Sequence, residues 1–126
     1  MLKLDFDKMG GLLPAVVQDH RTGEVLMVGF MNQEAWETTL RTGQATFFSR
    51  TRNTLWTKGL TSGNVQAVKE IWVDCDDDTV LLKVEQIGGA ACHTGHRSCF
   101  YRRVNSDRSL TVVGRPLFDP KEVYRK

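Results

Sequence analysis

The stretch "LLPAVVQDHRTGEVLMVGF", residues 12–30, decides the fold of this chain. It contains two apolar runs rich in β-branched residues, residues 12–19 and 24–30, on either side of the polar segment "HRTG". Two such runs joined by turn-forming residues are typical of a β-hairpin. We therefore expect the N-terminal part of the chain to form a pair of antiparallel strands.

A helix signal follows the hairpin directly, in "NQEAWETTLRTG", residues 32–43. Asn32 is a good N-cap, and Gly43 can end the helix. Trp36 and Leu40 share one face at helical spacing. This is the clearest helix signal in the chain.

Six further segments have the composition of strands, whereas "GLTSGN", residues 59–64, has that of a loop. The strands are expected at residues 45–50, 55–58, 65–74, 79–86, 98–104 and 110–114. The sequence therefore predicts an α+β fold, built mainly from antiparallel or mixed β-sheet with one or two short helices.

The bulk properties of the chain exclude several classes of protein. Its 126 residues suit a single domain over residues 1–126, and its net charge of only +2 argues against a scaffold that neutralises nucleic-acid phosphates. No apolar run is long enough to cross a membrane, and the charged segment "MLKLDFDKMG" does not resemble a signal peptide. We expect a cytoplasmic protein whose three cysteines stay reduced.

The segment "CHTGHRSC", residues 92–99, holds two of the three cysteines and two of the three histidines. Together with Cys75, Cys92 and Cys99 can supply three thiolates to a zinc ion that keeps its fourth position open for catalysis. The C-x₂-C spacing of most structural zinc sites is absent. The alternative is that Cys92 and Cys99 are small buried apolar residues, although the polar loop between them would bury poorly.

Each of the two histidines in this segment could be a fourth zinc ligand, a base or a surface residue. His93 lies beside a potential zinc ligand and is our candidate for proton transfer. His96 is expected to face solvent. His20, in the expected hairpin turn, is assigned no role.

The acidic run "DCDDD", residues 74–78, would repel itself unless something neutralises it. Side chains alternate in an extended strand, so Asp74, Asp76 and Asp78 would lie on one side and Cys75 on the other. Three carboxylates on one face suit Mg²⁺, which also keeps water and phosphate ligands. The alternative is a solvated acidic turn between two strands.

The stretch "SRTRNTLWTKGLTSGN", residues 49–64, combines cations with a Gly/Ser-rich turn. Cationic side chains and backbone amides of this kind can bind phosphate. The candidate substrate-binding residues are Arg50, Arg52, Lys58, Ser62 and Asn64. The alternative is a basic surface loop, because the spacing of a known phosphate-binding glycine motif is absent.

Taken together, "FFSRTRNTLWTKGLTSGN", "DCDDD" and "ACHTGHRSCFYR" closely resemble the phosphoribosyl-AMP cyclohydrolase family of histidine biosynthesis. The resemblance runs from about residue 11 to about residue 104 and is carried by the order and spacing of the three stretches. One departure is Leu60, where an acidic residue is expected in many members. Some members are fused to a pyrophosphohydrolase, whereas this chain is expected to be monofunctional.

The resemblance implies an enzyme that hydrolyses the adenine ring of 1-(5-phosphoribosyl)-AMP between N1 and C6, the third step of histidine biosynthesis. It implies one zinc ion per subunit on Cys75, Cys92 and Cys99, and Mg²⁺ on Asp74, Asp76 and Asp78. It also implies an intertwined homodimer. We expect the zinc site to be shared, with Cys75 of one subunit meeting the other two cysteines of its partner.

The expected reaction begins with attack of an activated water on C6, which is electron-poor because N1 carries the phosphoribosyl group. The C6–N1 bond then breaks, with His93 as our candidate for proton transfer. Two alternatives remain open. Another zinc nucleotide hydrolase such as a deaminase would usually show H-x-E and P-C-x-x-C, which are absent. A non-catalytic zinc module for nucleic acid would need four closed ligands and a strongly basic face.

Overall fold

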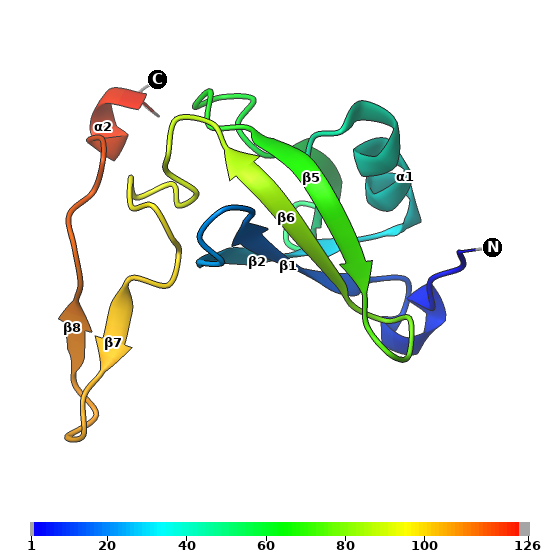
Figure 1. Ribbon diagram of the computed structural model, residues 1–126, viewed down its shortest axis with the longest axis horizontal. Helices are drawn as coiled ribbons and strands as arrows, with labels where there is room; N and C mark the ends of the chain where they lie inside the picture. The colour runs from blue at the N-terminus through cyan, green and yellow to red at the C-terminus, as the bar shows by residue number, and fades with distance from the viewer. Residues whose placement is uncertain (1, 124–126) are drawn as a thin grey trace.

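A four-stranded mixed β-sheet forms the centre of the computed structural model, which describes residues 2–123 (Figure 1). The strands lie in the order β2-β1-β6-β5. The outer pairs are antiparallel, whereas the central strands β1 and β6 run parallel. The expected α+β fold with a mixed sheet is confirmed. The strand bounds are β1 Leu13–Asp19, β2 Val25–Met31, β5 Gln66–Val73 and β6 Val80–Gln86.

The hairpin expected at residues 12–30 is confirmed. Leu13 pairs with Met31, and the register shifts at a bulge between Val17 and Gln18. The turn is closed by Asp19, whose side chain accepts hydrogen bonds from the backbone N–H groups of Arg21 and Thr22. A buried aspartate that accepts several bonds fixes this end of the hairpin firmly.

Helix α1, Gln33–Thr42, has the ends that the sequence predicts. The side chain of Asn32 accepts a hydrogen bond from the N–H of Ala35, and Gly43 ends the helix in the left-handed conformation at φ 75°. Trp36 is buried, but Leu40 is 51% exposed. Around the helix axis, the buried side chains extend from Trp36 to Thr39 and Ala35 in one direction. Leu40 lies about 40° from Trp36 in the other direction and therefore outside the buried face.

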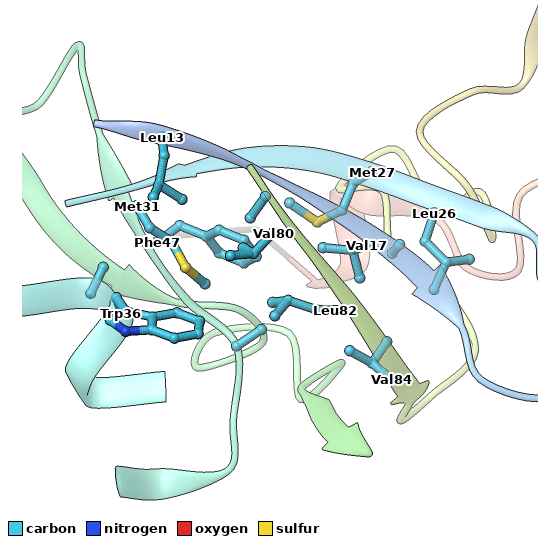
Figure 2. Packing of buried hydrophobic residues seen from close by; sticks show 14 of the residues in the cluster. Leu13, Val17, Leu26, Met27, Met31, Trp36, Phe47, Val80, Leu82 and Val84 are labelled. Carbon is cyan, nitrogen blue, oxygen red and sulfur yellow. The ribbon is translucent and has the colours of Figure 1, made fainter. Parts of the chain in front are cut away.

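The core lies between one face of the sheet and the layer made by α1 and the small hairpin of β3, Thr46–Ser49, and β4, Thr54–Thr57. Inward side chains of β1, β2 and β6 pack there with Trp36 and Phe47 (Figure 2). Gly29 leaves room for the ring of Phe47, because a Cβ at this position would lie 2.5 Å from Phe47 Cδ1. The core therefore requires a glycine in the middle of β2.

The acidic run forms a tight turn between two strands, which was the alternative to the extended strand on which the expected alternation of its side chains depended. Strand β5 ends at Val73, and Asp77 adopts a left-handed conformation at φ 64°. The N–H of Asp74 donates to the carbonyl of Thr79, which closes the turn at 3.0 Å. We refer to residues 74–79 as the acidic turn.

A narrow hairpin in the C-terminal part of the chain projects from the rest of the molecule (Figure 1). Its strands, β7 Arg102–Val104 and β8 Leu110–Val112, are shorter than the expected strands at residues 98–104 and 110–114. Five of its six strand residues are exposed. The remaining elements are a 3₁₀ turn, η1 Phe6–Met9, and the short helix α2 Pro120–Val123. No helix within residues 2–123 has the length and apolar character needed to span a membrane.

Candidate active site

Two cysteines lie side by side on the loop that follows β6, residues 90–99, which we call the cysteine loop. A turn brings them together: Cys92 donates its N–H to the carbonyl of His96 at 3.1 Å, and Gly95 donates to the carbonyl of Cys92 at 2.9 Å. The hydroxyl of Thr94 donates to the Cys92 sulfur at 3.0 Å. Cys92 is buried, whereas Cys99 is exposed at the wall of a pocket.

The cysteine loop is attached to strand β2. The N–H of Cys99 donates to the carbonyl of Leu26 at 2.7 Å, and the Ser98 hydroxyl donates to that of Val25, also at 2.7 Å. These bonds hold the second cysteine against a strand of the central sheet. The position of this thiol is therefore set by the β1–β2 hairpin as well as by its own loop.

The ionisation of the Cys99 thiol depends on its surroundings. Although much of Cys99 is exposed, the surrounding protein still desolvates its sulfur, and this burial raises the pKa of the Cys99 thiol to about 12. The neighbouring Cys92 adds to the rise through its charge and a hydrogen bond, while Lys58 opposes it. A cation bound between the sulfurs would favour their thiolate forms.

The histidines of the cysteine loop face in different directions. His93 is exposed and lines the same pocket as Cys99. His96 is only 8% exposed and stacks on Tyr101, with ring centroids 3.7 Å apart. Our expectation that His96 faces solvent is wrong, because the turn at Gly95 directs the next side chain inward against that ring.

The C-terminal segment closes over the cysteine loop. The N–H of Leu117 donates to the carbonyl of Gly95 at 2.7 Å, and Gly95 has φ +93°. A Cβ on Gly95 would lie 2.3 Å from the Phe118 carbonyl oxygen, so only glycine fits there. No sequence signal indicated this contact, since the last twenty residues carry little of the family resemblance.

A pocket of about 630 Å³ opens beside the cysteine loop, a size that suits a small organic ligand. Among the candidate substrate-binding residues, Arg52, Lys58 and Ser62 line it. Arg50 does not; its guanidinium lies 4.0 Å above the ring of Phe30. Asn64 is buried outside the pocket lining, and its backbone carbonyl accepts a hydrogen bond from the Gln86 side chain. The other lining residues are Met27, Ser49, Thr54, Leu55, Trp56, Thr57, Gly59, Leu60, Thr61, Ala91, His93 and Cys99.

Lys58 is the buried cation of this pocket, at 7% exposure. Burial lowers the pKa of its ammonium group, and the charges of Cys99 and Cys92 oppose this effect. From the sequence we predicted that Lys58 binds phosphate. The structure places it in electrostatic reach of the two thiols, where a positive charge favours thiolate.

The acidic turn brings together the carboxylates of Asp74, Asp76 and Asp78. One ligand oxygen from each lies within 4.8 Å of the others, and no other His, Cys, Asp or Glu group within residues 2–123 meets this criterion. The Lys8 ammonium lies 3.0 Å from Asp76 and 3.1 Å from Asp78. This hydrogen-bonded ammonium lowers the pKa of Asp78 to about 2. Lys8 therefore stands where a bound cation would neutralise the turn, a role that the sequence did not indicate.

Cys75 lies in the acidic turn and is exposed. The acidic turn and the cysteine loop are at opposite ends of β6 (Figure 1). Within the part of one chain that the structure describes, Cys75 does not approach Cys92 and Cys99 closely enough to share a metal ion with them.

Comparison with known proteins gives one consistent result. A family model described as phosphoribosyl-AMP cyclohydrolase matches residues 27–101, more than half of the chain. A protein of that name from Desulfatibacillum aliphaticivorans is 74% identical over 126 residues, which is 100% of both chains. A second from Desulforapulum autotrophicum is 61% identical over 125 residues, covering 99% of this chain and 100% of the relative. A third from Geotalea uraniireducens is 60% identical over 126 residues, again 100% of both. The matched range includes the pocket, the acidic turn and the cysteine loop.

Proposed function

This chain belongs to the phosphoribosyl-AMP cyclohydrolase family, and we propose that it hydrolyses the N1–C6 bond of phosphoribosyl-AMP in histidine biosynthesis. The observation that carries the proposal is the full-length identity to enzymes of that name. The pocket beside the thiol pair supports it, because the Cys99 thiol, the His93 side chain and two cations line one space of a size that suits a small ligand.

Zinc fits the donor set of the cysteine loop. The two thiols are adjacent, and without a cation the pKa of Cys99 is strongly raised. A zinc ion bound between them would stabilise both as thiolates. We assign Cys92 and Cys99 to one zinc ion per subunit, with Cys75 of a second subunit as the third ligand. Zinc bound in this way would lower the pKa of a coordinated water and so supply a nucleophile near neutral pH.

A homodimer is the second part of the proposal, and two features support it. The separation of Cys75 from the other thiols requires a second copy if all three bind one ion. The outer face of the sheet also carries a transverse apolar row, with Val28, Val16, Leu81 and Trp72 paired in turn across its strands. Val28 is 44% and Trp72 52% exposed, and the β7–β8 hairpin exposes further apolar side chains. A second copy covering these surfaces would remove them from water.

The acidic turn is the proposed magnesium site. Three carboxylate oxygens match the hard ligands that Mg²⁺ prefers, and the Lys8 ammonium shows that a cation is accommodated between two of them. Bound Mg²⁺ would orient phosphate or ribose oxygens of the substrate. In this proposal Lys8 leaves Asp76 and Asp78 when the metal binds.

The other residues are assigned by their position in the pocket. His93, which shares the pocket wall with Cys99, is proposed to move a proton at the reacting end of the substrate. Arg52 and Ser62 are proposed to hold phosphate, and Lys58 to keep positive charge beside the thiols. Arg50 and Asn64 stay predictions as substrate contacts, because both lie outside the pocket lining.

The test is a spectroscopic assay with phosphoribosyl-AMP, combined with an ammonia assay. The protein and the control Lys69→Gln, which changes an exposed residue of β5, should both turn over substrate. Cys92→Ser should fold and be inactive, and should fail to rescue a histidine auxotroph. Ring opening releases no ammonia, so stoichiometric ammonia would point to a deaminase. No turnover by folded, zinc-loaded protein would reject the proposed activity.

A further inference from the structure

Arg97 lies between the two cysteines in the sequence and connects their loop to the turn of the β1–β2 hairpin. Its Nε donates to the Glu24 carboxylate at 2.6 Å, and its Nη2 donates to Asp19. Its Nη1 also donates to the carbonyl of Gly89 at 3.4 Å. One guanidinium therefore joins two carboxylates that are 73 and 78 residues away in the chain.

The Asp19 end of this contact is rigid. Asp19 is 5% exposed, and one of its oxygens already accepts the N–H groups of Arg21 and Thr22. The other oxygen receives Arg97. A planar guanidinium held by two carboxylates has a defined orientation, which a single exposed ion pair would not give it.

The backbone of Arg97 transmits this position to both cysteines. Its carbonyl accepts the N–H of Ala91 at 2.9 Å, beside Cys92. The next residue, Ser98, precedes Cys99 directly, and its hydroxyl donates a hydrogen bond to the carbonyl of Val25. A displacement of Arg97 would therefore be passed to the residues next to both thiols.

We propose that Arg97, held by Asp19 and Glu24, is a positioning residue that fixes the separation of Cys92 and Cys99 for metal binding. This inference rests on the proposed zinc site. It assigns a role to a residue that touches neither metal nor substrate and acts only through the loop that carries the thiols. The residues that orient metal ligands in this way typically change metal affinity by about 10- to 100-fold when they are replaced.

The experiment compares four variants with the wild-type dimer. Arg97→Gln removes the charge, Arg97→Lys keeps the charge without the planar fork, and Glu24→Gln weakens only the half-exposed contact. Lys69→Gln is the control, because its exposed pair with Glu85 lies away from the cysteine loop. Zinc affinity is measured by chelator competition, and the site is observed through the visible spectrum of the Co²⁺-substituted protein. Metal-free protein is titrated with phenylarsine oxide, which binds two thiols only when they are close together.

We expect Arg97→Gln to weaken zinc binding about 10- to 100-fold, to alter the Co²⁺ spectrum and to weaken arsenical binding. Arg97→Lys should recover part of the loss, Glu24→Gln should show a smaller one, and Lys69→Gln should match wild type. A lower thermal midpoint of Arg97→Gln with unchanged zinc affinity, spectrum and arsenical binding would overturn the inference and leave Arg97 a purely structural residue. Wild-type protein that binds no zinc would instead reject the metal assignment of the proposed function. In that case unchanged arsenical binding by Arg97→Gln would still reject the positioning role.

Discussion

Co-expression of Cys75→Ala and Cys92→Ala chains should restore about a quarter of normal activity, although each variant alone is inactive. In a dimer with shared sites, each site takes Cys75 from one subunit and the other two cysteines from its partner. A mixed dimer then has one intact site and one doubly damaged site. Random pairing makes half of all dimers mixed, so a quarter of all sites are intact.

The geometry of the chain requires this sharing if three thiols bind one zinc ion. Strand β6 separates the acidic turn from the cysteine loop and has seven residues, which span about 20 Å. Two sulfurs bound to one zinc at about 2.3 Å each lie at most about 4.6 Å apart. Cys75 of one subunit therefore cannot join the thiol pair of the same subunit while the sheet is intact.

The assay is turnover of phosphoribosyl-AMP per mole of subunits, with a different affinity tag on each chain so that mixed dimers can be isolated. Isolated mixed dimers should have about half of wild-type activity. The matched control is co-expression of Cys92→Ala with Cys99→Ala. Both lesions then lie in the same half of the site, so every site stays damaged. Equal background activity in both mixtures would refute the shared site.

Three further predictions follow from individual contacts. Lys8→Met should tighten Mg²⁺ binding at the acidic turn, because it removes the ammonium group that pairs with two of the carboxylates. Mg²⁺ competition against Tb³⁺ luminescence measures the affinity, and an unchanged value would show that Lys8 does not compete with the metal. An alanine in the left-handed conformation costs about 1–2 kcal/mol, and Gly95→Ala should lower the free energy of unfolding by more than this because its Cβ also meets the Phe118 carbonyl oxygen. The control in thermal unfolding is Gly114→Ala, because Gly114 has φ +80° and open space around it. Equal losses in the two variants would contradict the clash. Burial alone would raise the pKa of Asp19, but its hydrogen bonds with Thr22, Arg21 and Arg97 lower it overall. Its contribution to stability is therefore present above the ordinary aspartate pKa and lost as pH falls through the lowered one, so Asp19→Asn should flatten the acid side of a plot of thermal midpoint against pH.

Local signals predicted the elements that depend on neighbouring residues. The hairpin and α1 followed from apolar runs, turn residues and the caps Asn32 and Gly43, all of which act over a few positions. The parallel pairing of β1 with β6 joins residues more than sixty positions apart, and periodicity carries no information about such pairing.

The errors have the same physical origin. The acidic turn needs Asp77 in the left-handed conformation. Aspartate tolerates this conformation, but its presence in a sequence predicts it far less strongly than a glycine does. His96 is buried because Tyr101 and the C-terminal segment fold back on its loop. No local signal indicated a role for Arg97, because its two carboxylate partners are 73 and 78 residues away in the chain.

The position of Cys75 inside the acidic turn has a consequence for the second metal. Cys75 is flanked by Asp74 and Asp76, so a partner that receives this thiol at its cysteine loop receives the carboxylates with it. Both proposed metals would then face one substrate, each site combining the acidic turn of one subunit with the pocket of the other. Asp76→Ala chains mixed with Cys92→Ala chains should therefore restore about a quarter of normal activity, as in the cysteine experiment. Asp76→Ala mixed with Cys75→Ala should restore none, because both lesions belong to the same turn. If instead the first mixture stays inactive while the two cysteine variants complement each other, the carboxylates serve a pocket other than the one that receives Cys75.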